Sequence, residues 1–115
     1  MLVVKLSSGL GNQLFQYAFF KYLEQNTNQK VVFEDKSFLK NNNYRRSELA
    51  VVYPDYPVNN NIPFLNSHLT GLKRRLYHTA FLLDPHNVII KDDTAYTIPD
   101  TYKENKIYYF DGYWQ

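Results

Sequence analysis

Near its N-terminus the chain reads Leu2-Val3-Val4-Lys5-Leu6-Ser7-Ser8-Gly9-Leu10-Gly11-Asn12. The almost wholly apolar run from Leu2 to Leu6 is typical of a strand that is covered on both faces of a parallel sheet. The two glycines that follow predict a tight turn into a helix, and unpaired amides and the dipole of a first helical turn favour an anion. We therefore expect a strand, a turn and a helix that together form a phosphate-binding site.

A helix is predicted from Asn12 to about Asn26, with Asn12 as its N-cap. Lys30–Glu34 then predicts a second buried strand, which completes a βαβ unit. Apolar residues at helical spacing predict that the core-facing stripe of the helix consists of Leu14, Phe15, Ala18, Phe19, Tyr22 and Leu23. The opposite face, expected to meet another domain or line a cleft, carries Gln13, Gln16, Tyr17, Phe20 and Glu24.

The remaining chain predicts one further helix and two further strands. Residues 35–66 are rich in Asn, Pro and Tyr, which indicates loops with a short helical turn at Arg46–Val51. The second helix is expected from a Ser67 cap to Leu83, with Asp84-Pro85 as its stop, and the strands at Val88–Ile90 and Ile107–Phe110. The core-facing stripe of this second helix is predicted to consist of Leu69, Leu72, Leu76, Ala80 and Leu83. Lys73, Arg74 and Arg75 are predicted to point outward. Residues 1–115 thus predict a single α/β domain, a Rossmann-like parallel sheet with flanking helices.

Composition excludes several classes of function. Of the 115 residues, 44% are hydrophobic and 17% aromatic, which suffices for a packed core. A net charge of +2 is too small to indicate a nucleic-acid partner, and the lack of cysteine excludes disulfide and thiolate chemistry. The histidines (His68, His78, His86) lack the spacing of helical metal ligands and no Asp-x-Asp pair occurs, so we expect no metal.

The expected location is the cytoplasm. The sequence shows no signal-peptide pattern and no apolar stretch long enough for a transmembrane segment. Peripheral attachment to the inner face of a membrane is the alternative location.

The glycine turn allows more than one interpretation. Gly9-Leu10-Gly11 fits the start of a dinucleotide fingerprint, with Glu34 or Asp35 as the ribose ligand, but Leu14 replaces the third glycine. A tight turn without a ligand is a further alternative. The side-chain amide groups of Asn12 and Gln13 can hydrogen-bond to a sugar or a diphosphate, although Asn12 can equally be a helix cap.

Two other groups of residues carry weaker signals. Tyr113 and Trp114 can stack on a sugar ring, with core packing as the alternative. Asp92-Asp93 indicates a cap or a solvated loop rather than a general base. Because an aromatic run without a following helix comes after the last strand, we expect the chain to be a fragment of a longer protein.

Three motifs resemble the bacterial α-1,2-fucosyltransferases, glycosyltransferase family 11. Residues 8–19 (SGLGNQLFQYAF) resemble the family's opening motif, and residues 44–49 (YRRSEL) its Arg-x-x-Glu-Leu segment. Residues 109–115 (YFDGYWQ) resemble the Gly-Tyr-Trp-Gln motif that ends the first half of the family's enzymes. Ser8 departs from the pattern, since family members often carry a second glycine there.

This resemblance implies the N-terminal half of a GT-B-type enzyme that transfers L-fucose from GDP-fucose to the 2-hydroxyl of a galactoside. The reaction would invert the anomeric centre and need no metal or other cofactor. By resemblance, the donor-binding loop is Gly9, Leu10, Gly11 and Asn12, with Gln13 as a weaker companion, and no residue is assigned as the catalytic base.

The expected partners are the sugar-nucleotide donor, a glycan acceptor and the missing C-terminal half of the same enzyme. The family's His-x-Arg-Arg-x-Asp motif, which holds the leaving GDP, does not occur in this sequence. We therefore expect the chain alone to be inactive. A non-catalytic nucleotide- or glycan-binding module, or a truncated inactive relic, is the alternative to the enzyme.

Overall fold

The computed structural model describes residues 1–35, 47–59, 71–92, 98–99 and 101–114. Its strands are β1 (Leu2–Lys5), β2 (Val31–Glu34), β3 (Asn87–Lys91) and β4 (Ile107–Asp111). Its helices are α1 (Leu10–Asn26), α2 (Leu49–Val52) and α3 (Gly71–Leu83). Every predicted strand is confirmed, as is the end of the second helix before Asp84-Pro85. The short helical turn predicted at Arg46–Val51 is found at Leu49–Val52, and Arg46 lies outside the described residues. The predicted Ser67 cap and Leu69 lie outside the described residues.

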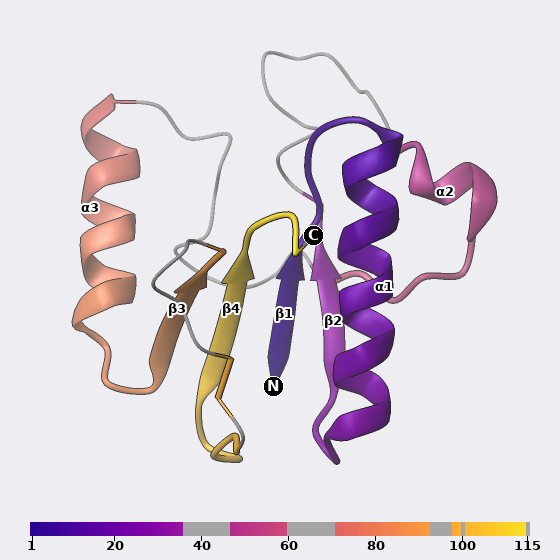
Figure 1. The fold of residues 1–115 in the computed structure, drawn as a ribbon. Helices are drawn as coiled ribbons and strands as arrows, with labels where there is room; N and C mark the ends of the chain where they lie inside the picture. Colours follow the sequence, from indigo (N-terminus) through magenta and orange to yellow (C-terminus); the bar gives the residue numbers. More distant parts are fainter. Residues whose placement is uncertain (36–46, 60–70, 93–97, 100, 115) are drawn as a thin grey trace.

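The four strands form one parallel sheet in the order β2-β1-β4-β3 (Figure 1). The predicted α/β fold, with a parallel sheet and flanking helices, is therefore confirmed. Because all strands run the same way, the loops that follow them meet at one edge of the sheet. This edge brings together the β1–α1 turn and the residues that follow β4, although they are about a hundred positions apart in the chain.

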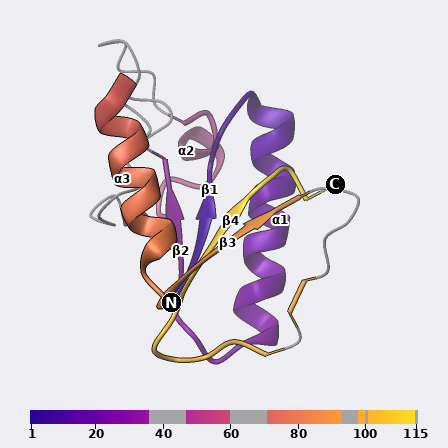
Figure 2. The ribbon, with the colours of Figure 1, turned by 90° about the vertical axis from the view of Figure 1, so that its left-hand side faces the viewer.

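Helices α1 and α3 lie on opposite faces of the sheet, as Figure 2 shows. Alternate strand residues point to each face, so Leu2, Val4 and Phe110 pack on the α1 side. Val3, Val32 and Tyr109 form a smaller cluster with Phe81 of α3. The continuous apolar runs in β1 and β2 are explained by this two-sided cover.

The predicted inner face of α1 is largely wrong. Phe19 and Leu23 are buried as expected, but Leu14, Phe15, Ala18 and Tyr22 are exposed. The buried positions also include Gln13, Gln16 and Phe20, which the sequence placed on the opposite face. Phe20 stacks on Phe33 with ring centroids 4.4 Å apart, and the two glutamines hydrogen-bond to segments that are distant in the chain. Partners outside the helix, rather than its own hydrophobic periodicity, select the buried face.

The predicted inner stripe of α3 is also wrong. Leu72, Leu76, Ala80 and Leu83 are exposed, while Phe81 is buried against the sheet with its ring centroid 6.4 Å from that of Tyr109. Lys73 and Arg75 are exposed, as predicted. Among the side chains of this helix that the structure describes, Phe81 and not the leucines makes the buried contact with the sheet.

The assignment of faces on α3 predicts unequal effects of truncation. Phe81→Ala should lower the free energy of unfolding by about 3–5 kcal/mol, because it removes a buried ring. Leu72→Ala on the same helix should change it by less than about 0.5 kcal/mol, because that side chain is exposed. Urea unfolding followed by circular dichroism measures both variants, and the reverse order would show that the helix packs through its leucine stripe.

Candidate functional site

The candidate site is the β1–α1 loop with the segments that surround it at the carboxyl edge of the sheet. Gly9 is the N-cap of α1, with φ −76° and ψ 171°, and the helix begins at Leu10. The prediction that Asn12 caps the helix is therefore wrong, because Asn12 already lies in the first turn. Gly9 and Gly11 are exposed and Asn12 is half-buried.

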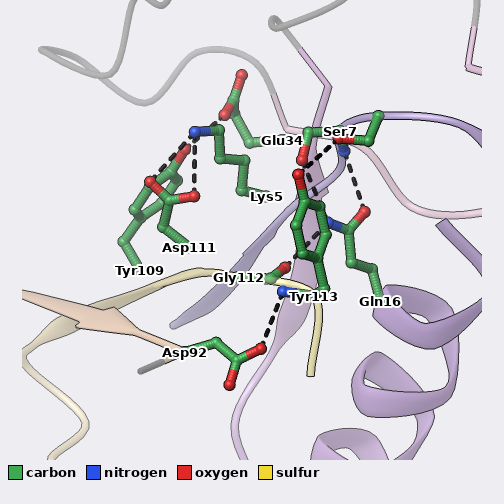
Figure 3. Close-up of polar contacts among 10 residues, drawn as sticks. Lys5, Ser7, Gln16, Glu34, Asp92, Tyr109, Asp111, Gly112 and Tyr113 are labelled. Carbon is green, nitrogen blue, oxygen red and sulfur yellow. Dashed lines mark hydrogen bonds and ion pairs between the residues drawn. The ribbon is translucent and has the colours of Figure 1, made fainter. Parts of the chain in front are cut away.

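Gln16 connects this loop to the segment after β4. Its side chain is fully buried, and its oxygen accepts a hydrogen bond from the Ser7 amide at 3.0 Å. Its nitrogen donates to the Gly112 carbonyl at 2.9 Å and to Ser7 Oγ at 3.2 Å, as Figure 3 shows in part. One amide thus satisfies backbone groups on two loops.

Gln13 connects the same loop to the segment before α2. Its nitrogen donates to the Ser8 carbonyl at 2.6 Å, and its oxygen accepts from Ser47 Oγ and the Leu49 amide, both at 2.8 Å. The side chain is fully buried. Gln13 therefore acts as a positioning residue, and its burial is incompatible with the direct donor contact that the sequence suggested.

The amides of the loop fall into two groups. The Leu10 amide donates to the Glu48 carboxylate at 3.2 Å, so a side-chain anion already lies at the start of α1. The Ser7 amide is held by Gln16. Within the described part of the chain, the amides of Ser8, Gly9 and Gly11 have no hydrogen-bond acceptor. These three donors remain for a ligand.

Ser8 has a left-handed backbone conformation, with φ +66°. A residue with a Cβ is strained there and glycine is not, which gives a physical reason for the glycine that often occurs at this position in the resembled family. The Ser8 hydroxyl hydrogen-bonds to the Tyr113 hydroxyl at 2.9 Å. Tyr113 is exposed, and in Figure 3 its ring stands beside the loop.

The turn after β4 depends on Asp92. Its carboxylate accepts hydrogen bonds from the amides of Tyr113 at 3.2 Å and Trp114 at 2.7 Å, whereas Asp93 lies outside the described residues. A Cβ on Gly112 would overlap the Cβ of Asp92. Trp114 stacks on Phe19 at 4.4 Å, which is the core-packing alternative considered for this residue. Gly112 is thus required by the fold itself.

Gly9 and Gly11 differ from Gly112 in this respect. A Cβ built on either residue meets no atom within 4 Å. In the first turn of a helix, alanine would be the more stable choice at Gly11. Among the described residues, nothing in the fold itself explains these two glycines, whereas a ligand that approaches the backbone closely would.

Charged groups beside the loop are already paired. Lys5 Nζ lies 3.0 Å from an Asp111 oxygen, and Tyr109 donates to the buried Glu34 carboxylate at 2.8 Å (Figure 3). Because Glu34 is fully buried, it cannot reach a ribose, which removes one of the two carboxylates of the dinucleotide interpretation. The strand order also differs from the 3-2-1 order of dinucleotide-binding halves.

A separate groove of about 360 Å³ lies between α1 and residues 52–57. Tyr17 and Tyr53 stack in its wall with ring centroids 4.1 Å apart, and Lys21 pairs with Glu24 at its rim. Its lining includes the aromatic residues Tyr17, Phe20, Tyr53 and Tyr56. Tyr17, Phe20 and Glu24 in its lining belong to the α1 face that the sequence predicted to meet another domain or line a cleft. The contribution of residues 52–57 was not predicted, because the contact joins two distant segments.

The three motifs that are separate in the sequence meet at this site. Ser47, Glu48 and Leu49 of the second motif bond to Gln13 and Leu10 of the first. Gly112, Tyr113 and Trp114 of the third motif contact Gln16, Ser8 and Phe19 of the first. Arg45 and Arg46 lie outside the described residues. The opening motif is therefore the centre about which the other two are arranged.

Comparison with known proteins identified no relative. No protein-family model, curated protein or solved structure matches the chain. In the described ranges, no group of His, Asp and Glu side chains is arranged to hold a metal ion. None of the helices that the structure describes is long and apolar enough to cross a bilayer.

Removal of the Gln16 amide tests its connecting role. Gln16→Ala should lower the free energy of unfolding by about 2–4 kcal/mol, because it leaves the Ser7 amide and the Gly112 carbonyl without their partner. Gln25→Ala, on the exposed side of α1, is the matched control and should stay within about 0.5 kcal/mol. Equal effects in urea unfolding would contradict the proposed connection.

Stability at high pH should depend on Tyr109. Burial, followed by the neighbouring Glu34 charge, raises the pKa of Tyr109 far above its ordinary value of 10.0. The folded state retains a proton that the unfolded state loses, so this stabilisation is present below pH 10 and decreases as pH rises. Above that pH we expect the free energy of unfolding to fall by about 1.4 kcal/mol per pH unit. Tyr109→Phe should lack this component of the slope in alkaline urea titrations, whereas Tyr22→Phe, at an exposed position, should retain it.

Proposed function

We propose that this chain contributes the donor-side wall of an inverting, metal-independent glycosyltransferase that moves L-fucose from GDP-fucose to the 2-hydroxyl of a galactoside. The single observation that carries the proposal is the convergence of the three motifs on the β1–α1 loop. The parallel sheet by itself brings the first and third motifs to one edge, and the side-chain hydrogen bonds of Gln13, Gln16 and Glu48 join all three there. In this proposal the enzyme works in the cytoplasm, and its partners are the donor, a glycan acceptor and a second half with a GT-B arrangement.

The free loop amides are the contacts that the diphosphate needs. The amides of Ser8, Gly9 and Gly11 follow a parallel strand and open a helix, where an anion gains from both hydrogen bonds and the helix dipole. Open space at the Cβ positions of Gly9 and Gly11 lets phosphate oxygens reach the backbone. As the resemblance implies, the Asn12 side chain adds a contact to the same ligand in this proposal.

Charge balance explains why the chain alone should bind weakly. Of the residues that the structure describes at this edge, Lys5, the cation at the end of β1, is paired with Asp111, which leaves little positive charge for a departing diphosphate. The arginines of the His-x-Arg-Arg-x-Asp motif would supply that charge, and the sequence does not contain them. Donor binding is therefore shared with a second half, and the isolated chain is catalytically silent.

A binding module without catalysis, or an inactive relic, is the second candidate. The observation that favours it is the Glu48 carboxylate on the Leu10 amide, because this side chain takes one donor of the loop and repels a second anion. If the chain is part of the enzyme, the diphosphate either displaces the Glu48 carboxylate from the Leu10 amide or binds beside this negative charge.

Titration of the chain with GDP and GDP-fucose, followed by amide NMR signals, tests the proposal. Both ligands should shift the Ser8, Gly9 and Gly11 signals. Gly11→Ala should raise the free energy of unfolding by about 0.5–1 kcal/mol, because alanine is the better helix residue. The same variant should weaken GDP binding about tenfold, because the new methyl group obstructs a hydrogen bond to a charged ligand.

Glu48→Gln is the complementary variant. It removes the resident negative charge, so GDP should bind severalfold more tightly while the helix loses only a few tenths of a kcal/mol. Binding of a galactoside alone would favour the glycan-binding module, and a response to neither nucleotide nor galactoside would favour the relic. Unchanged loop signals in the presence of GDP would remove the support for a donor site.

A further inference from the structure

Helix α3 presents a row of leucines to the outside of the molecule. Leu72, Leu76 and Leu83 are 72%, 60% and 77% exposed. The helix stands at the periphery of the fold, on the face of the sheet opposite α1 (Figure 2). Large apolar side chains that are exposed together on one face of a helix, here with Thr79 between Leu76 and Leu83, indicate a surface that is covered when the protein works. We call these residues, Leu72, Leu76 and Leu83, the leucine ridge.

The direction of the ridge follows from helix geometry. Phe81, which is 1% exposed, fixes the side of α3 that faces the sheet. At 3.6 residues per turn the leucines point to the opposite side, and the ridge extends for roughly 17 Å along the axis. Lys73 and Arg75 lie roughly 80° to either side of the ridge, and both are exposed. The helix therefore presents an apolar centre between two basic flanks.

The charges around the ridge select its partner. Gly71–Leu83 contains no acidic residue, and Asp84 just beyond it uses its carboxylate to accept the His86 amide at 2.9 Å. The exposed apolar face of α1 differs, because Lys21, the basic residue beside it, is paired with Glu24 at 2.7 Å. Only α3, of the two long helices described, combines exposed leucines with exposed cations on both sides. A surface complementary to this helix has an apolar layer that takes up the leucines and negative charges that contact the two cations.

We propose that α3 attaches the chain to the surface of an anionic lipid bilayer. The leucine ridge enters the boundary between headgroups and acyl chains, while Lys73 and Arg75 contact lipid phosphates. The helix lies in the plane of the membrane and does not cross it, which agrees with its length and polarity. This attachment is independent of any transferase activity of the loop.

Flotation with lipid vesicles tests the proposal. The chain should float with vesicles of phosphatidylcholine and phosphatidylglycerol in equal amounts, much less with pure phosphatidylcholine, and less as salt is raised. Replacement of the ridge by serine (Leu72→Ser, Leu76→Ser and Leu83→Ser together) should lower the partition coefficient at least about tenfold. Lys73→Glu with Arg75→Glu should have an effect of about the same size.

Matched control variants distinguish binding through the leucine ridge from nonspecific binding to vesicles. Leu14→Ser with Phe15→Ser removes exposed apolar residues from α1, and Lys91→Glu with Lys103→Glu reverses exposed charges elsewhere. Both control variants should bind anionic vesicles within about twofold of the unaltered chain. Circular dichroism should show unchanged helix content in every variant, because all the altered side chains are exposed.

Three results would overturn the proposal. One is failure of the unaltered chain to float with anionic vesicles. Another is loss of binding in the α1 control that equals the loss in the ridge variant. The third is a dimer in analytical ultracentrifugation that the ridge variant dissociates and that does not bind vesicles, since a second copy of the chain would then cover the ridge.

Discussion

The site depends on the need of buried amide groups for hydrogen-bond partners. Gln13 and Gln16 lie on one side of α1, and each has its side chain fully buried. Gln16 satisfies backbone groups at Ser7 and Gly112, and Gln13 satisfies groups at Ser8 and Leu49. An unpaired amide in the interior is costly, so each glutamine holds its loop in one place. The β1–α1 loop is thereby held before any ligand arrives.

A loop fixed in this way can keep some of its donors unpaired. The left-handed conformation of Ser8 and the exposed backbone of Gly9 and Gly11 are maintained by contacts on the other side of the loop. Gly112 shows the opposite use of glycine, since Asp92 fills the space where its side chain would be. The fold therefore requires Gly112, whereas Gly9 and Gly11 leave open space for a ligand at the start of α1.

On both long helices the buried face differs from the one that hydrophobic periodicity selected, although Phe19 and Leu23 of α1 are buried as predicted. On α1 the core side includes two glutamines, and on α3 the buried contact made by a described side chain is that of Phe81. Leu14, Phe15 and the leucine ridge are consequently directed away from the core. The two outward faces have different charges around them, which is why the ridge between Lys73 and Arg75 suits a lipid surface and the α1 face does not.

The sequence by itself determined which segments are strands and which are helices, because alternation, apolar runs and stop signals such as Asp84-Pro85 act over a few neighbouring residues. It also indicated the glycine turn as the place for an anion. Only the tertiary structure decided which side of each helix is buried, which loop amides are occupied, and that Glu48 lies at the start of α1. These features depend on residues such as Gln16 and Gly112, which are distant in the chain and come together only when parallel strands align their carboxyl ends.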